Sequence, residues 1–349
     1  MLAIKNQKRI NLIYVLGSLF FYNAYLLQKY FNLGIFTNTY ITNQYQFNYQ
    51  NCGFVARGLL PSILEFLGIN NQFGYYALYN VVVLLYACLI VYISGLYEIK
   101  NRNLYIIASL FFFFGIPHFT IEGLRTDSIL LLNTLIVFIL LKRKQYIPFL
   151  IISIFTLFIH EVAIFLFVPV IFLLLEGKEK WIYSFILGIV FVGIVLLSNK
   201  ITEQQAIEIL QRVNEEEIAY GNYALYILNT KESIRFFFGE VGVALFLVYG
   251  VFYILALFLA FKALFTTKIT AFRWLFLMPL VLCFVAVDYP RWYCFVYFLA
   301  MLYALHYNLF NRKAFIYIAL VTVLFGIPKG TSYDFGVLPF LFKLLSKIL

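Results

Sequence analysis

Ionisable side chains gather at three short places in a chain of 349 residues that is otherwise strongly apolar. These polar stations are His118, Glu122, Arg125 and Asp127; His160 and Glu161; and Asp288 and Arg291. Because ionisable groups inside membrane segments are costly, their recurrence within apolar runs indicates a functional site. A His or a carboxylate can act as a general base and an Arg can bind a phosphate, so these residue types favour proton transfer beside an anionic substrate.

The pair His160 and Glu161 is the sharpest catalytic candidate, because apolar residues flank it on both sides. Either side chain can serve as a general base when its surroundings perturb it. The competing interpretation is a buried His that is hydrogen-bonded for structural reasons. Asp288 is the third candidate base. It stands with Arg291 in the sequence DYPRW, at a turn between two apolar runs, where a structural ion pair is the alternative.

The first station lies in the sequence GIPHFTIEGLRTD. Pro117 can end a helix, and His118 and Glu122 are four residues apart, which places them on one helix face. Arg125 and Asp127 follow, so a candidate acid or base stands beside a candidate anion clamp. The alternative is a cluster of ion pairs that only joins two helices. The spacing is not HExxH and the chain has three His in all, so we predict no metal site and no cofactor.

Arg57 is the only charged residue between Phe31 and Leu64, and it lies in the segment GFVARGLLP. An isolated guanidinium with a glycine on either side is suited to bind a phosphate or diphosphate through forked hydrogen bonds. The alternative is an anchor at the membrane interface. Arg57, Arg125 and Arg291 come from separate parts of the sequence and are all predicted on one side of the membrane. We expect them to bind the anionic substrate, together with His118, Glu122 and Asp127.

The composition predicts an all-α, polytopic membrane protein. Hydrophobic residues make up 64% of the chain and charged residues 12%, with a mean hydropathy of +0.90. Soluble domains carry about twice that charged fraction. The net charge is +10, but the Lys and Arg residues stand at the ends of apolar runs, where they orient helices, so we expect no nucleic-acid partner. The four Cys have no metal-ligand spacing and are interpreted as packing residues.

Apolar runs of about 15 to 25 residues match the length of helices that cross a hydrocarbon core about 30 Å thick. We predict about 11 to 12 transmembrane or half-membrane helices, with the first acting as a start-transfer segment and the N-terminus in the cytoplasm. A short amphipathic segment is expected at 336–348. The predicted spans are 10–30, 73–97, 104–123, 127–142, 146–159, 162–175, 181–199, 241–262, 271–288, 291–309 and 314–327.

Basic clusters then fall on the cytoplasmic side at every second loop, as the positive-inside rule requires. This pattern holds only if 146–175, which has basic clusters at both ends, folds as a hairpin of two short segments. His160 and Glu161 would lie at its outward tip, in a cavity lined by protein. The alternative is one long tilted helix with His160 near the middle of the membrane.

Two outward loops are long, at about 31–72 and about 200–240. Both contain Asn, Gln and Tyr, which pair with hydroxyl groups and stack on sugar rings, although ordinary interfacial Tyr residues are an equal alternative. The second loop is predicted to be helical from Thr202. We see no repeat or linker, and we expect residues 1–349 to form a single integral membrane domain.

The layout of the chain resembles the Wzy-type O-antigen and surface-polysaccharide polymerases. The features that carry the resemblance are the number of apolar spans, GFVARGLLP in an early outward loop, IHE within a double apolar run, and DYPRW late in the chain. The resemblance extends over the whole chain in the arrangement of spans and loops, while the sequence motifs match only loosely.

The resemblance implies a metal-independent glycosyltransferase in the bacterial inner membrane that polymerises undecaprenyl-diphosphate-linked oligosaccharides on the periplasmic face, without a cofactor. It implies a lipid-linked oligosaccharide and the bilayer as partners, with a chain-length regulator as a further candidate. In that activity Arg57, Arg125 and Arg291 would stabilise the departing diphosphate. Glu161, His160 or Asp288 would deprotonate the acceptor hydroxyl.

Three other functions stay open. The weakest is a membrane acyltransferase, whose expected outward His would have to be His118 or His160. A GT-C-like glycosyltransferase that uses a polyprenyl-phosphate sugar has a similar topology, but it usually carries an acidic motif in the first outward loop, and residues 31–64 contain no Asp or Glu. A flippase or transporter of lipid-linked oligosaccharides should carry charges deep in several spans and show repeat symmetry. In this chain the predicted charges crowd one side.

Overall fold

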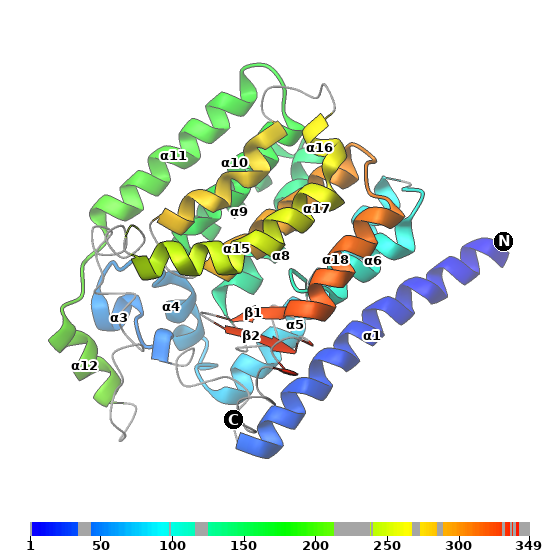
Figure 1. The fold of residues 1–349 in the computed structure, drawn as a ribbon. Coiled ribbons are helices and arrows are strands. Elements are labelled where there is room, and N and C mark those ends of the chain that lie inside the picture. The colour runs from blue at the N-terminus through cyan, green and yellow to red at the C-terminus, as the bar shows by residue number, and fades with distance from the viewer. Residues whose placement is uncertain are drawn as a thin grey trace. The chain divides into compact units, whose positions relative to one another are not determined.

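The computed structural model of this chain is helical, with one short β-hairpin (Figure 1). The residues that it describes are 2–33, 43–97, 99–115, 125–212, 238, 240–266, 273–284, 289–329, 332–335, 337 and 340–341. Three helices are long and apolar enough to cross a membrane, over Gln7–Gln28, Gln72–Leu96 and Glu179–Leu197, within this described part of the chain. The predicted number of spans and the cytoplasmic N-terminus remain predictions.

The chain divides into two compact units. The first contains Met1–Tyr22, Val83–Ile121 and Thr230–Leu349, and the second contains Asn23–Val82 and Glu122–Asn229. Two long helices, α1 (Leu2–Leu33) and α5 (Gln72–Leu96), contribute residues to both units. The expectation of a single membrane domain concerns the whole chain and stays a prediction.

In the first unit, α17 (Tyr289–His306) is the central helix. Every residue from 291 to 305 is buried, which is typical of an apolar helix enclosed by its neighbours. It packs against α15 (Glu240–Ala260) and against a 3-10 helix, η3 (Arg273–Phe284). The hydroxyl of Tyr297 donates to the backbone oxygen of Tyr253 at 2.6 Å, so a polar atom in this core is satisfied by main chain.

The rest of the first unit comprises α6 (Arg102–Phe111), α16 (Lys262–Thr266), α18 (Arg312–Phe325) and the hairpin of β1 (Gly326–Lys329) and β2 (Ser332–Phe335). The strands are antiparallel, with Gly326 opposite Phe335. The sequence did not predict this hairpin. It follows α18 directly because Gly326 ends the helix with a φ of 74°, a backbone conformation that favours glycine.

The predicted helix over 104–123 is shorter in the structure. Helix α6 ends at Phe111, and a turn follows in which the N–H of Gly115 donates to the backbone oxygen of Phe112. A Cβ atom at Gly115 would lie 2.2 Å from the backbone oxygen of Ser109, so this close approach requires glycine. Residues 116–124, and nearly all of the amphipathic segment predicted at 336–348, lie outside the described residues.

The second unit holds the helices α8 (Thr126–Lys142), α9 (Tyr146–Ile159), α10 (Ile164–Leu174) and α11 (Glu179–Leu197), and a one-turn 3-10 helix, η1 (Glu161–Ala163). Between α9 and η1, His160 adopts an extended conformation with φ −162° and ψ 114°. Helix α8, about 25 Å long at 1.5 Å per residue, packs against both α9 and α10, and α11 does the same. His160 therefore interrupts the helix, so 146–175 is not one continuous helix, while the hairpin with an outward tip remains a prediction.

Three short helices complete the second unit: α3 (Tyr49–Cys52), α4 (Leu59–Phe66) and α12 (Glu203–Gln211). Helix α12 begins with a capping box, in which Thr202 and Gln205 satisfy each other's backbone N–H groups. In Figure 1, α12 lies next to α3. Segments from the two loops that were predicted to face outward therefore meet in one unit.

Candidate functional site

Arg57 lies in a loop whose backbone is held in an unusual conformation. Its φ is 68°, in the left-handed region that residues other than glycine rarely adopt. The preceding turn is built by Gly53, with φ 66°, and the following helix α4 begins after Gly58, where a Cβ atom would lie 2.5 Å from the ring of Tyr49. Strained backbone conformations of this kind persist only where contacts with the surrounding structure hold them in place, and they cluster at functional sites.

The guanidinium of Arg57 reaches across to the break between α9 and η1, where it binds the carboxylate of Glu161. Nε of Arg57 donates to both carboxylate oxygens, at 3.0 and 3.1 Å, and Nη2 donates to Oε1 at 2.5 Å. The side chains are 24% and 17% exposed. A forked, charge-assisted pair that is mostly shielded from water is stronger than an exposed ion pair, and it fixes the direction of both groups.

His160 completes this cluster, and its imidazole is buried. Its Nδ1 atom lies 3.3 Å from the backbone N–H of Val162 and 3.5 Å from Oε2 of Glu161. The two contacts require different protonation states. A neutral ring accepts from Val162 through its Nδ1 lone pair, whereas a protonated Nδ1 donates to Glu161. A proton can therefore lie on Nδ1 of His160 or on the carboxylate of Glu161, so either group can act as a proton acceptor.

Arg125 and Asp127 lie in the same unit, at the start of α8. Nε of Arg125 is 3.0 Å from Oδ2 of Asp127, and the aspartate is 1% exposed. A carboxylate in the first turn of a helix is also stabilised by the helix dipole. Asp127 is close enough to His160 to interact with its charge. His118 and Glu122, the other members of this polar station, lie outside the described residues.

Arg291 is buried in the first unit, where its guanidinium carbon lies 4.1 Å from the centre of the Trp292 ring. This geometry is a cation–π contact. Asp288, the candidate base beside it in sequence, is outside the described residues. Of the three predicted arginines, Arg57 and Arg125 belong to the second unit and Arg291 to the first, so a common site for all three remains a prediction.

A second polar region adjoins the Arg57 loop, which is residues 53–58 between α3 and α4, and was not predicted in detail. The loop packs on α12 through a small apolar core that comprises Phe47, Val55, Ile201, Ala206, Ile209 and Leu210. Asn199 holds this loop through two hydrogen bonds. Its backbone N–H donates to the backbone oxygen of Phe54 at 2.6 Å, and its Nδ2 donates to the backbone oxygen of Cys52 at 3.2 Å. Only the Thr202 to Gln205 capping pattern signals this helix in the sequence, and nothing in the sequence signals its partner.

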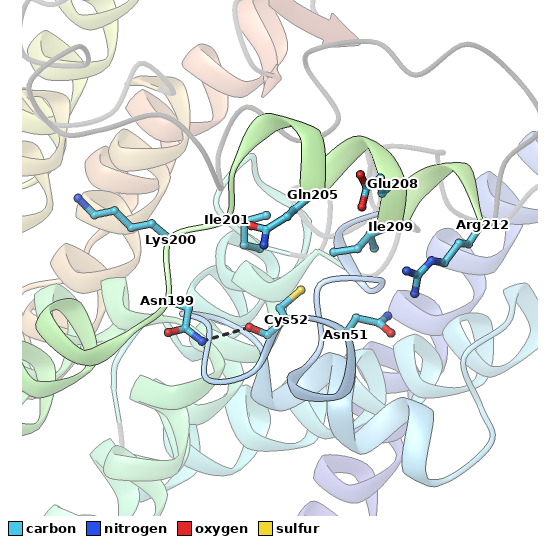
Figure 2. A pocket seen from close by; sticks show the side chains of 9 residues that line it. All are labelled: Asn51, Cys52, Asn199, Lys200, Ile201, Gln205, Glu208, Ile209 and Arg212. Atoms are coloured by element: carbon cyan, nitrogen blue, oxygen red, sulfur yellow. Dashed lines mark hydrogen bonds between the residues drawn. The ribbon is translucent and has the colours of Figure 1, made fainter.

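Next to this core is a polar pocket of about 400 Å³, between α3 and α12 (Figure 2). Its walls include Asn51 and Cys52 on the α3 side, Asn199 at its edge, and Gln205, Glu208 and Arg212 on the α12 side. Burial raises the pKa of the Cys52 thiol to about 11, so this Cys is a neutral thiol at physiological pH. No group of three His, Cys, Asp or Glu side chains among the described residues is arranged to hold a metal ion.

Comparisons of the chain with protein-family models, with curated proteins and with solved structures find no match. The class that the structure itself defines is a helical protein whose apolar helices are compatible with a membrane. Its distinguishing feature is a half-buried Arg57–Glu161 pair beside His160, at a break between two short apolar helices.

Proposed function

We propose that this protein is a polysaccharide polymerase of the bacterial inner membrane, which transfers an oligosaccharide from undecaprenyl diphosphate to a second lipid-linked repeat unit. The observation that carries the proposal is the forked ion pair of Arg57 and Glu161 beside His160. Three groups that were each predicted for this chemistry, an anion-binding Arg and two candidate bases, lie in direct contact. They come from segments 104 residues apart.

The ion pair suggests how donor binding is coupled to catalysis. A diphosphate is a stronger partner for a guanidinium than a single carboxylate is, because it offers more oxygens and more charge. When the donor binds Arg57, it competes with Glu161 for the forked hydrogen bonds. The released carboxylate is then a better base, because it has lost the cation that stabilised its charged form.

The reaction that follows is a single displacement. The carboxylate of Glu161 takes the proton of the acceptor hydroxyl, and the acceptor oxygen forms a bond to the anomeric carbon of the donor sugar. The bond between that carbon and the diphosphate oxygen breaks, and the electron pair leaves with undecaprenyl diphosphate. Arg57 stabilises the charge that develops on this leaving group. His160 relays the proton away from Glu161 through the contact at its Nδ1 atom.

The remaining predicted residues take supporting roles in this proposal. Arg125, whose partner is Asp127, and Arg291 are the further candidates for diphosphate binding. His118 and Glu122 are candidates for substrate binding, and Asp288 stays the alternative base. A chain-length regulator is the protein partner to expect. A GT-C-like glycosyltransferase and a flippase remain the competing functions, and the test below separates them.

A surface-glycan gel of a deletion strain tests the proposal. The deletion should leave single repeat units on the lipid anchor, and the wild-type gene should restore a ladder. Arg57→Ala and Glu161→Gln should reduce polymerisation by roughly 10²-fold or more at equal membrane levels, because each removes a group that acts in the transition state. Arg143→Ala, which removes an Arg from the turn after α8, is the matched control and should retain the ladder.

Other results would reject the proposal. Loss of even the single unit in the deletion strain would place the protein earlier, as a flippase or a repeat-unit glycosyltransferase. A normal ladder in the deletion strain would exclude polymerisation altogether. Full activity of both variants would keep the polymerase but remove this site from it.

A further inference from the structure

We infer that the pocket between α3 and α12 binds a sugar residue that carries a carboxylate, as part of the oligosaccharide chain. The inference rests on the proposed function, because it assigns to that activity an acidic saccharide as substrate. Its basis is the lining of the pocket, its position on the Arg57 loop, and a cation on α12 that has no partner among the described residues.

The lining of the pocket suits a hydroxylated ligand. Small-molecule sites are usually lined mainly by apolar side chains, but this pocket is bordered by the amides of Asn51, Asn199 and Gln205. Each amide offers both a donor and an acceptor, which matches a ring of hydroxyl groups. Its volume of about 400 Å³ lies within the range of roughly 300 to 1,000 Å³ that is usual for small-molecule sites. A lipid tail would find little apolar surface here.

The charge of the pocket favours an anion. Arg212 and Lys200 contribute two positive charges and Glu208 one negative charge, which leaves a net charge of +1. Among the described residues, the Arg212 guanidinium has no carboxylate partner, whereas Glu208 accepts a hydrogen bond from Gln204 at 3.1 Å. Figure 2 shows the side chain of Arg212 extending toward Asn51 from the opposite wall, while Lys200 extends away from them. Arg212 is therefore the residue placed to bind a carboxylate inside the pocket.

The position of the pocket connects it to the proposed reaction. Cys52, the last residue of α3, lines the pocket and Arg57 follows five residues later, so their Cα atoms are at most about 18 Å apart. A short oligosaccharide can extend over such a distance. The loop is also fixed at this point by the two hydrogen bonds of Asn199. A sugar in the pocket would therefore hold the rest of the chain in a defined direction relative to Arg57.

Protection of Cys52 from alkylation tests the inference on the purified full-length protein in detergent. Cys88 is replaced by Ser, and a neutral maleimide is used at raised pH, because the thiol has a pKa of about 11. The probe is cellobiouronic acid, and cellobiose is its neutral counterpart. The acidic disaccharide should protect Cys52 at a concentration at least tenfold lower than cellobiose does.

Two variants separate the charge from the fold of α12. Gln205→Glu keeps a side-chain acceptor for the Thr202 N–H, so the capping box persists while the pocket loses its net positive charge. Arg212→Gln removes the cation itself. Both should abolish the preference for the acidic sugar. Gln211→Ala, an exposed change on the same helix outside the pocket, is the control and should leave the preference unchanged.

The outcomes distinguish this inference from the proposed function. No protection by the acidic disaccharide, or equal protection by both disaccharides, overturns the acidic-sugar site. A glycan ladder that is unchanged by Gln205→Glu and Arg212→Gln in cells removes the pocket from the reaction, and the polymerase then stands without it. The absence of a polymerisation defect in the deletion strain rejects the polymerase, while protection of Cys52 in vitro does not depend on that result.

Discussion

Arg57 combines two features that have different energetic consequences. Its side chain forms the fork with Glu161, which is favourable, and its backbone adopts a left-handed conformation, which is not. For a residue with a Cβ atom, the left-handed conformation costs about 1 to 2 kcal/mol. A protein selected only for stability would place glycine here, as it does at Gly68, whose φ is 66°. An arginine at this position therefore indicates selection for the guanidinium.

Comparison of Arg57→Gly with Arg57→Ala measures the backbone cost directly, because both variants lack the guanidinium and differ by one methyl group. We expect the Ala variant to have a free energy of unfolding about 1 kcal/mol lower than the Gly variant, since only glycine adopts this φ without strain. Reversible unfolding in mixed micelles provides the measurement. Equal stability of the two variants would mean that residue 57 is not held in the left-handed region.

The sequence predicted Arg57 and the pair of His160 and Glu161 separately, but it could not predict that Arg57 contacts Glu161. Each stood out because a charged or polar group within an apolar run is unusual. The fork joins residues 104 positions apart, and it depends on the path of the loop between α3 and α4. Helical periodicity carries no information about such a path. Arg57 and Glu161 were accordingly predicted as separate groups, an anion clamp and a base, and not as an ion pair.

At the scale of elements, the docking of the Arg57 loop on α12 positions both the ion pair and the polar pocket. The sequence predicted that α12 is helical and that both loops face the same side, because loop orientation follows from charge. It did not predict that they pack on each other, since only a few apolar side chains, such as Val55 and Ile209, make that contact. A contact this small has no periodic signature in the sequence.

Gly53 is the point at which this docking can be weakened selectively. A Cβ atom there would lie 2.8 Å from Nδ2 of Asn199, and would disturb the hydrogen bond from Asn199 to Cys52, in addition to the cost of a positive φ. Gly68 has the same φ but no atom within 4 Å of the added Cβ, so Gly68→Ala is a matched control that carries only the backbone cost.

We therefore expect Gly53→Ala to increase hydrogen exchange in α12, because this helix would lose part of the loop that covers it. The backbone cost alone is at least about 1 kcal/mol, because Gly53 combines a positive φ with a ψ of −153°, and this corresponds to roughly a fivefold or larger increase in the rate of exchange from opened states. Gly68→Ala should leave exchange in α12 unchanged. If both variants increased it equally, the effect would be one of backbone strain and the docking on α12 would not explain it.

At the scale of the whole molecule, most boundaries of the apolar helices could be predicted, because hydropathy and basic clusters mark them. The predicted 127–142 and 146–159 agree closely with α8 and α9. The shortening of 104–123 and the hairpin after Phe325 could not be read from hydropathy, since local turns at Gly115 and Gly326 decide them. The division into two units likewise depends on packing between helices that are distant in sequence.

Whether α9 and α10 form a hairpin within the membrane determines on which side of the membrane the proposed site lies. If its two arms return the chain to the cytoplasmic side before α11, then Gln145 and Gln211 lie on opposite sides, because α11 is the only full crossing between them. If 146–175 crossed once as a single helix, the two positions would lie on the same side. Both side chains are exposed, so each can be replaced by Cys without loss of buried contacts.

Variants with one Cys introduced at either position test the orientation in spheroplasts. In both, Cys52 and Cys88 are replaced by Ser and the buried Cys283 and Cys294 are kept. We expect Gln211→Cys to react with a membrane-impermeant maleimide in intact spheroplasts, and Gln145→Cys to react only after permeabilisation. Reaction of both variants from outside would show that 146–175 crosses the membrane once and does not return the chain to the cytoplasmic side. The reverse pattern would place Arg57 and Glu161 on the cytoplasmic side with α12, and a polymerase acting on the outer face could then not use them.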